Sequence, residues 1–167
     1  VFQDPQSSLN PRLTVSTILT EPMKAHAIGE NSEERIKLAG EILGQVGLEP
    51  SMLSRFPHEF SGGQRQRIGI ARALVLNPKF IVCDEVTSAL DVRVQAQVLK
   101  LLDELRNRLD LTYLFISHNI EVVRYFCDDI AVMHQGKIIE SGRAEVVCDN
   151  PSHDYTRRLI EAVPKFD

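Results

Sequence analysis

The chain has 167 residues, of which 43% are hydrophobic and 25% are charged, and its formal net charge is −4. This length and composition are typical of one globular domain, alone or with a small subdomain, and they exclude disordered, collagen-like and disulfide-scaffold proteins. The acidic balance argues against a nucleic-acid-binding domain, and no apolar run approaches the ~18 residues that span a bilayer. The three cysteines have no metal-ligand spacing, which favours a reducing compartment.

The first third of the chain is predicted to be mainly helical. A loop over 4–12 precedes a short helix that Thr14 caps and that Pro22 ends or kinks. A second helix begins after a capping Asn31 and stops at Gly47. Its apolar residues recur at helical spacing: Ile36, Ala39, Ile42, Leu43 and Val46.

The second half of the chain alternates strands and helices. Two continuous apolar runs, 80–83 and 112–116, predict strands that are buried on both faces of a parallel sheet. An amphipathic helix between them completes a βαβ unit. A hairpin is predicted over 130–140, and a last helix follows Pro151.

The segment Ser61-Gly62-Gly63-Gln64 carries the sharpest local pattern. Ser61 with Gln64 three residues later forms a capping box at the start of a helix. The two glycines allow another backbone to come close, and the free N–H groups of a helix start attract anions. The pattern therefore fits either an anion site or an ordinary capped helix.

Two adjacent acids, Asp84 and Glu85, follow the first predicted strand. Ligands of open α/β sheets bind beyond the carboxyl ends of the strands, where one acid can hold Mg²⁺ and the next can deprotonate a water. A solvated acidic turn is the alternative. His118 follows the second strand, 34 residues after Asp84, and adjacent parallel strands would bring it beside Glu85.

Taken together, these segments resemble the ATP-binding cassette (ABC) ATPases. Residues 61–64 are similar to the family's signature motif, 80–85 to Walker B, and 88–91 to the D-loop. His118 resembles the switch histidine, and Gln3 the Q-loop glutamine. Five motifs in family order are far more specific than any one of them.

Three further segments narrow the resemblance to the ATPases of oligopeptide and dipeptide importers. These segments are 4–12, 89–97 and 150–157, of which the last discriminates best. The resemblance implies a P-loop NTPase (RecA-like) fold of the α/β class, with a partial parallel-sheet core and an inserted α-helical subdomain. It also implies four parts: 1–7 with the Q-loop, 8–77 as the helical subdomain with the signature motif, 78–145 as the core, and 146–167 as a C-terminal helical extension.

The sequence contains no G-x-x-x-x-G-K-[ST] motif, whose backbone and lysine hold phosphates in P-loop proteins. The only Gly-Lys pair is Gly136-Lys137, which is followed by Ile138. In the family, this Walker A motif precedes the Q-loop. We therefore expect the chain to be the C-terminal portion of a nucleotide-binding domain, and loss of the P-loop in evolution is the alternative.

The resemblance also implies roles for the acids and the histidine in ATP hydrolysis. Asp84 and Gln3 would bind Mg²⁺ with ATP, and Glu85 would be the general base for the attacking water. His118 would contact the γ-phosphate and that water. Asp91 would order the interface of a head-to-tail dimer with two ATP sites.

The signature residues would act on the ATP that the second ABC ATPase subunit holds. These ATP-binding residues are Ser61, Gly62, Gly63 and Gln64. The second subunit can be identical or different.

The resemblance implies that the parent protein powers peptide uptake through integral-membrane permease subunits. It would lie at the cytoplasmic face of the cell membrane, without insertion into it and without nucleic acid. Two alternatives remain open. One is a soluble ABC ATPase that acts on nucleic acid or ribosomes, to which the basic run Arg65, Arg67 and Arg72 would belong. The other is a non-catalytic truncated module.

Because the phosphate-binding motif is absent from these residues, we expect the isolated 167-residue chain to bind Mg-ATP weakly or not at all and to hydrolyse none. We also expect it to associate with itself through an exposed strand edge. Isothermal titration with Mg-ATP and a phosphate-release assay test the first expectation. Micromolar binding with turnover would contradict it.

Overall fold

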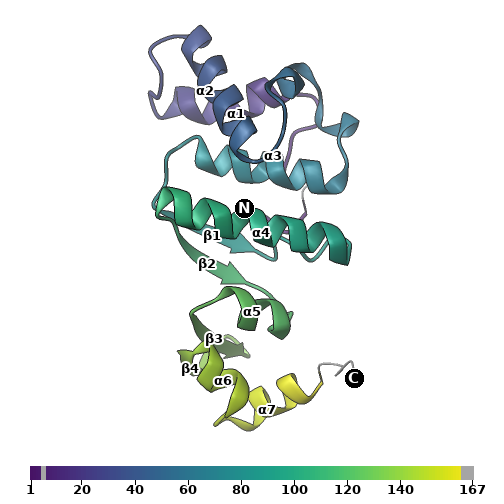
Figure 1. Ribbon diagram of the computed structural model, residues 1–167, viewed down its shortest axis with the longest axis vertical. Coiled ribbons are helices and arrows are strands. Elements are labelled where there is room, and N and C mark those ends of the chain that lie inside the picture. Colours follow the sequence, from purple (N-terminus) through teal and green to yellow (C-terminus); the bar gives the residue numbers. More distant parts are fainter. Residues whose placement is uncertain (5–6, 163–167) are drawn as a thin grey trace. The chain divides into compact units, whose positions relative to one another are not determined.

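The computed structural model describes residues 1–4 and 7–162. The chain divides into two compact units, Val1–Ile116 and Ser117–Asp167. The elements of the first unit are α1 (Val15–Ala25), α2 (Ser32–Gln45), η1 (Pro50–Ser54), η2 (Pro57–Glu59), α3 (Gly62–Leu74), β1 (Phe80–Asp84), α4 (Val92–Leu109) and β2 (Thr112–Ile116) (Figure 1). Those of the second unit are α5 (Ile120–Phe126), β3 (Asp129–His134), β4 (Lys137–Arg143), α6 (Ala144–Asp149) and α7 (Asp154–Glu161).

Two parts of the predicted segments lie outside the described residues. They are Pro5 and Gln6 of the loop over 4–12, and residues 163–167 of the C-terminal extension. The four-part division stays a prediction. Within the described part of the chain, every helix is too short or too polar to cross a bilayer.

Side-chain caps begin the first two helices where the sequence predicts them. The Thr14 hydroxyl accepts a hydrogen bond from the Thr17 N–H, and the Asn31 side chain accepts one from the Glu34 N–H at 2.9 Å. Pro22 does not end α1, which continues for three more residues. A proline inside a helix removes the one hydrogen bond that its missing N–H would make, and α1 tolerates this loss.

Helix α3 is tied to the surrounding loops through its arginines. The guanidinium of Arg65 donates to the Pro57 carbonyl at 2.8 Å, and that of Arg67 donates to the Val46 carbonyl at 2.9 Å. Arg72 donates to the Ser8 carbonyl at 2.5 Å. The basic run is thus engaged within the chain, which leaves the nucleic-acid alternative without the feature that suggested it.

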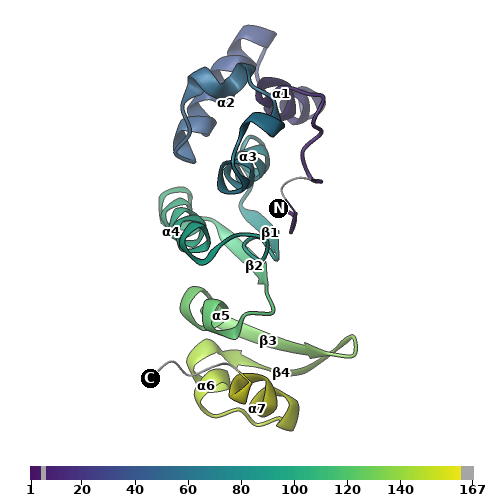
Figure 2. The ribbon, with the colours of Figure 1, turned by 90° about the vertical axis from the view of Figure 1, so that its right-hand side faces the viewer.

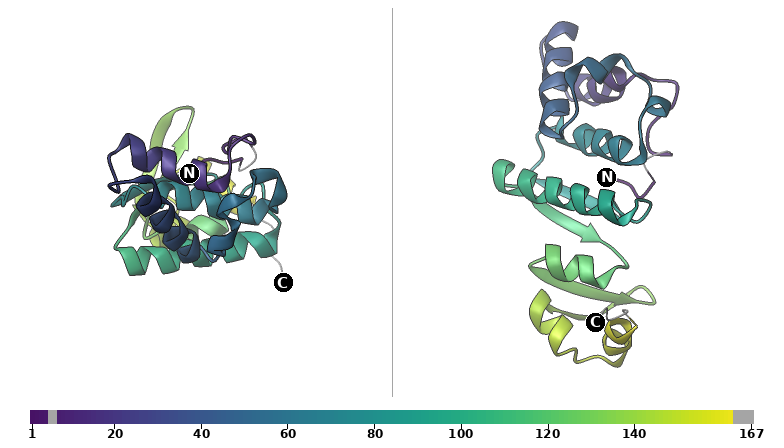
Figure 3. Two further views of the ribbon diagram at one scale, coloured as in Figure 1. Left: turned by 90° about the horizontal axis from the view of Figure 1, so that it is seen from above. Right: turned by 45° about the vertical axis from the view of Figure 1, so that its right-hand side comes forward.

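The strands β1 and β2 form a parallel sheet, as predicted, in register from the pair Phe80–Thr112 to the pair Asp84–Ile116. Helix α4 lies along one side of this sheet (Figure 2). The Tyr113 hydroxyl donates to the Leu102 carbonyl of α4 at 3.1 Å, and burial raises the pKa of this phenol. Helix α3 runs alongside α4 (Figure 3).

The prediction that both faces of these strands are buried is wrong. Burial alternates along β1, where Ile81 and Cys83 face inward. The opposite face is exposed at Phe80 (54%) and Leu114 (49%). Continuous apolar runs show what a strand can bury, whereas the helices of the described residues cover only one side of this sheet.

The second unit is built on the predicted hairpin. β3 and β4 pair in antiparallel fashion, with a register shift between Val132 and Met133. Gln135 and Gly136 have φ of 47° and 75°, the positive values that a tight type I′ turn requires. Helices α5, α6 and α7 pack against this hairpin around a small apolar core: Ile130, Val132, Ala144, Val147 and Cys148.

Glu140 on β4 holds the segment that leads into α7. Its carboxylate accepts hydrogen bonds from the Ser152 N–H at 2.7 Å and hydroxyl at 2.8 Å, and from the His153 N–H at 3.1 Å. The last helix begins at Asp154, capped by His153, a few residues later than Pro151 suggests. The Thr156 side chain and then the Ser152 and His153 donors lower the pKa of Glu140 to about 2.

This lowered pKa predicts a pH dependence for the second unit. Because an unfolded glutamate titrates near 4.5, the ionised Glu140 stabilises the fold above that pH, and the contribution is lost as pH falls from 4.5 towards 2. We expect Glu140→Gln to lower the thermal stability of the chain at pH 7 and to lower it less at pH 3. An NMR titration that places the Glu140 pKa at its ordinary value would contradict this expectation.

Candidate active site

The first residues of the chain continue the sheet beyond β1. The Val1 nitrogen donates to the Val82 carbonyl at 2.7 Å, and the Asp84 N–H donates to the Val1 carbonyl at 2.9 Å. This is the bonding pattern of a parallel neighbour, so Gln3 follows the edge of the sheet at which β1 ends. Gln3 and Asp84 consequently line one cavity of about 540 Å³.

The oxygen donors at this cavity suit Mg²⁺. Asp84 offers a carboxylate and Gln3 a side-chain amide, both of the hard oxygen type that Mg²⁺ prefers. The described residues hold no group of three or more His, Cys, Asp or Glu side chains that could cage a metal ion. Mg²⁺ needs no such cage, since it commonly binds through one or two protein oxygens together with waters and substrate phosphates.

Glu85 follows Asp84 in a left-handed backbone conformation, with φ of 45°. Its N–H donates to the Ile116 carbonyl at 2.9 Å, and its carbonyl accepts bonds from the Ser88 N–H at 3.0 Å and hydroxyl at 2.9 Å. A residue with a Cβ rarely adopts this conformation, which costs roughly 1–2 kcal/mol. Such strain persists where surrounding bonds enforce it, and it is concentrated at functional sites.

The predicted capping box at the start of α3 is present. The Gln64 N–H donates to the Ser61 hydroxyl at 3.3 Å, and the Gln64 side chain accepts from the Ser61 N–H at 3.0 Å. Ser61 and Gly62 are exposed, whereas Gly63 and Gln64 are half-buried. The first N–H groups of α3 thus lie at a surface that a further molecule can reach.

The segment between Glu85 and α4 meets the start of α3. Asp91 caps α4 by accepting from the Val94 N–H at 3.0 Å. A methyl group built on Gly62 would lie 3.7 Å from Leu90. The D-loop-like segment therefore lies close to the signature-like segment within one chain.

His118 lies two residues beyond β2, in the second unit, and its side chain is exposed. It precedes Asn119, whose side chain caps α5 by accepting from the Glu121 and Val122 N–H groups. The place of His118 beside Glu85 stays a prediction.

Cys83 directly precedes Asp84 on the covered face of β1. Its side chain is fully buried, and burial raises the pKa of the thiol to about 11. The thiol is therefore protonated at neutral pH, which makes it a poor nucleophile and metal ligand.

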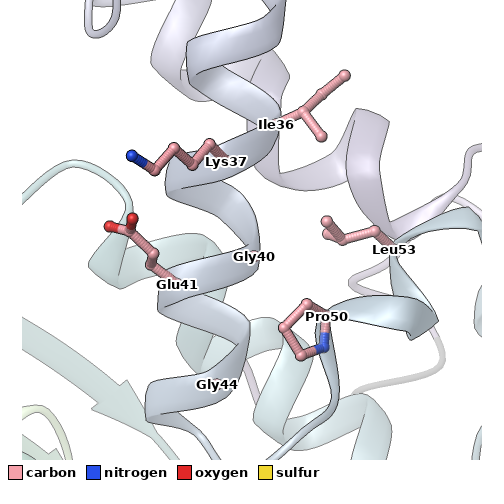
Figure 4. Close-up of a pocket in the computed structure, with 7 residues that line it drawn as sticks. All are labelled: Ile36, Lys37, Gly40, Glu41, Gly44, Pro50 and Leu53. Atoms are coloured by element: carbon pink, nitrogen blue, oxygen red, sulfur yellow. The ribbon is translucent and has the colours of Figure 1, made fainter.

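A second cavity, of about 480 Å³, lies between α2 and η1 (Figure 4). Ile36, Pro50 and Leu53 gather on one side of α2, and Lys37 and Glu41 extend from its other side. Ile36 was expected in the buried stripe of this helix but is 45% exposed. This cavity is mainly apolar, and none of the predicted site residues lines it.

Sequence reasoning missed several residues around the proposed metal donors. Phe2, Asp4, Ser7 and Ser8 also line the cavity of Gln3 and Asp84. Asp4, Ser7 and Ser8 belong to the segment 4–12 that narrows the resemblance, but neither that segment nor their position beside Gln3 assigned them to the site. The left-handed conformation of Glu85 has no sequence signal, because non-glycine residues rarely adopt it.

The strain at Glu85 predicts that a glycine variant is more stable than an alanine variant there, which is the reverse of their usual order in a helix. In the isolated chain, we expect Glu85→Gly to be more stable than Glu85→Ala by about 1 kcal/mol, because glycine adopts positive φ freely. At the exposed Glu104 within α4, the alanine variant should have a free energy of unfolding about 1 kcal/mol higher than that of the glycine variant. Urea unfolding of the four variants measures both differences. The same order at both positions would contradict the strain.

The chain is similar throughout its length to curated peptide-transport proteins. It is 50% identical over 167 residues to the oligopeptide transport ATP-binding protein OppF of Bacillus subtilis, covering 100% of this chain and 55% of that protein. It is also 50% identical to the dipeptide transport ATP-binding protein DppF of Lactococcus lactis, covering 100% of this chain and 54% of that protein. The chain spans about half the length of the curated relatives it matches.

Solved structures of related proteins share the fold. The structure of cbiO1 from Clostridium perfringens, part of the ABC transporter complex cbiONQ, gives a TM-score of 0.76 at 29% identity and covers 98% of this chain and 63% of that one. The dimeric, post-hydrolysis structure of the ATP-binding cassette MJ0796 with ADP and Pi gives a TM-score of 0.72 at 33% identity. It covers 86% of this chain and 62% of that one. These likenesses confirm the predicted α/β fold of the P-loop NTPase type.

The model of the ABC transporter family matches residues 1–88, just over half of the chain. The matched part contains Gln3, the start of α3 and both acids that follow β1. The chain therefore belongs to the ABC transporter family.

Proposed function

We propose that this chain is part of an ATP-hydrolysing subunit that drives peptide uptake. The cavity that Gln3 and Asp84 line together is the observation that carries the proposal, because it lies where a parallel sheet offers a ligand site. The OppF and DppF relatives, named for oligopeptide and dipeptide transport, support peptides as the transported substrate.

Asp84 and Gln3 would hold Mg²⁺ together with the phosphates of ATP. When bound, the ion neutralises charge on the phosphates and orients them for attack. Glu85 accepts the proton of the attacking water, as its place one residue after Asp84 allows. Three backbone hydrogen bonds restrain Glu85 at this position.

The start of α3 would act on a second nucleotide, held by a partner ATPase subunit. Ser61, Gly62, Gly63 and Gln64 lie around the first N–H groups of the helix, which favour an anion such as the γ-phosphate. His118 would contact the reacting phosphate, and Asp91 would order the interface between subunits. The dimeric MJ0796 structure is a related cassette with ADP and Pi, which supports such an assembly.

The protein would work at the cytoplasmic face of the membrane, bound to integral permease subunits. Residues 8–77 would form the helical subdomain that docks on the permease, and 146–167 a C-terminal extension. The related cbiO1 protein is part of a transporter complex, which supports partners of this kind.

The general-base role is tested by Glu85→Gln in the intact protein that contains this chain. The substitution keeps the side-chain shape but cannot accept the proton, so we expect hydrolysis to slow by about 10²–10⁴-fold while ATP binding persists. Glu104→Gln on the exposed face of α4 is the matched control and should retain the wild-type rate.

Near-normal turnover by Glu85→Gln would rule out the general-base role. If the wild-type protein hydrolyses no ATP in the presence of its permease, the proposed function as a whole fails. Peptide uptake by membrane vesicles that contain the reconstituted transporter then tests the substrate class.

A further inference from the structure

The C-terminal segment 150–157, which narrows the resemblance best, is held on the hairpin by a single side chain. One carboxylate oxygen of Glu140 accepts hydrogen bonds from the Ser152 N–H and hydroxyl, and the other accepts one from the His153 N–H. These three donors come from two consecutive residues and converge on one carboxylate. The segment is therefore shaped to receive the Glu140 side chain of β4.

A second contact fastens the start of α7 to the hairpin. The ring of Tyr155 stacks on that of His134 at the end of β3, with centroids 3.9 Å apart and planes inclined by 28°. The His153 ring caps the helix by accepting from the Tyr155 N–H at 3.0 Å. With eight residues, α7 is too short to be stable alone in water, so these contacts keep it helical.

Helix α7 shares the small apolar core of the second unit with α5, the helix that follows His118. Tyr155 and Leu159 of α7 pack against this core. Ile120 and Val123 of α5 pack against the same core. Because α5 has only seven residues, it too depends on packing. If α7 undocks, the core loses apolar cover, and the packing that holds α5 weakens.

The turn that carries His118 is fastened to the start of α5. The Asn119 side chain accepts from the Glu121 N–H at 3.1 Å and from the Val122 N–H at 3.3 Å. The Asn119 N–H donates to the Ser117 hydroxyl at 3.0 Å. His118 lies between these two bonded residues, so a movement of the start of α5 displaces the backbone of His118.

We propose that residues 151–161 form a C-terminal strap that positions His118. Glu140 holds the strap, and the core that α7 shares with α5 links docking of the strap to the turn at His118. Docking of α7 is the two-state element, because a short helix can open locally while the rest of its unit stays folded. The kinetic part of the proposal rests on the proposed function, in which His118 contacts the reacting phosphate. The packing part depends on the fold alone.

The first test is Glu140→Gln in the intact protein that contains this chain. Either orientation of the glutamine places its NH₂ group against a donor of the strap, so at least one bond is lost. We expect faster amide exchange at Glu121 and Val122, because the start of α5 opens more often. We also expect kcat to fall by about 2- to 30-fold with KM for ATP unchanged. Glu145→Gln on the exposed first turn of α6 is the matched control and should retain the wild-type values.

A cycle with His118→Ala separates positioning from a general loss of stability. If the strap acts through His118, Glu140→Gln lowers kcat in the wild type but leaves the residual hydrolysis of His118→Ala unchanged. A general loss of stability would lower both rates by the same factor. Tyr155→Ala removes the stacking contact and should act in the same direction as Glu140→Gln. Rates are measured by phosphate release well below the Tm of every variant, and exchange by mass spectrometry.

Unchanged exchange at the start of α5 in both Glu140→Gln and Tyr155→Ala would overturn the packing link. Faster exchange with an unchanged kcat would overturn the positioning of His118, as would an equal proportional loss of kcat in the His118→Ala background. Absence of ATP hydrolysis in the wild type defeats the proposed function, whereas the exchange measurements still decide the packing link.

Discussion

Hydrogen bonds from arginines of α3 to backbone carbonyls tie separate segments of the first unit to one helix. Arg65, Arg67 and Arg72 reach segments that lie far apart in the sequence, ending at Pro57, Val46 and Ser8. The carbonyls of Val46 and Ser8 lie at the end of a helix and in a loop, where the backbone has no regular partner. The loop that follows Gln3 and the end of α2 are thereby fixed to the helix that begins with the signature residues.

Local chemistry explains why much of this fold is predictable from sequence. The caps at Thr14, Asn31 and Ser61 depend on residues three positions away, so short patterns identify them. The parallel strands follow from their apolar runs. What covers a strand is decided by distant segments, which is why the exposure of Phe80 was not foreseen.

In the candidate site too, some features follow from the sequence and others depend on tertiary packing. Motif order assigns Gln3 and Asp84 to one metal site, which stays a prediction, and both residues line one cavity because the direction of parallel strands fixes their positions. The close approach of Val94 to Gly63, on which a built methyl group would lie 2.5 Å from Val94 Cγ1, could not be predicted, since it depends on how closely two helices approach. The left-handed backbone of Glu85 is also a tertiary result, enforced by bonds to Ile116 and Ser88.

The burial of Cys83 makes this chain a reporter of its own local opening. A thiol reagent reaches the sulfur only when β1 separates from the layer that covers it, so the labelling rate measures an opening equilibrium, as amide exchange does. The reporting atom lies one residue from Asp84 and needs no engineered label. In the intact protein that contains this chain, protection of Cys83 by nucleotide would thus express ligand binding as the free energy of opening one strand.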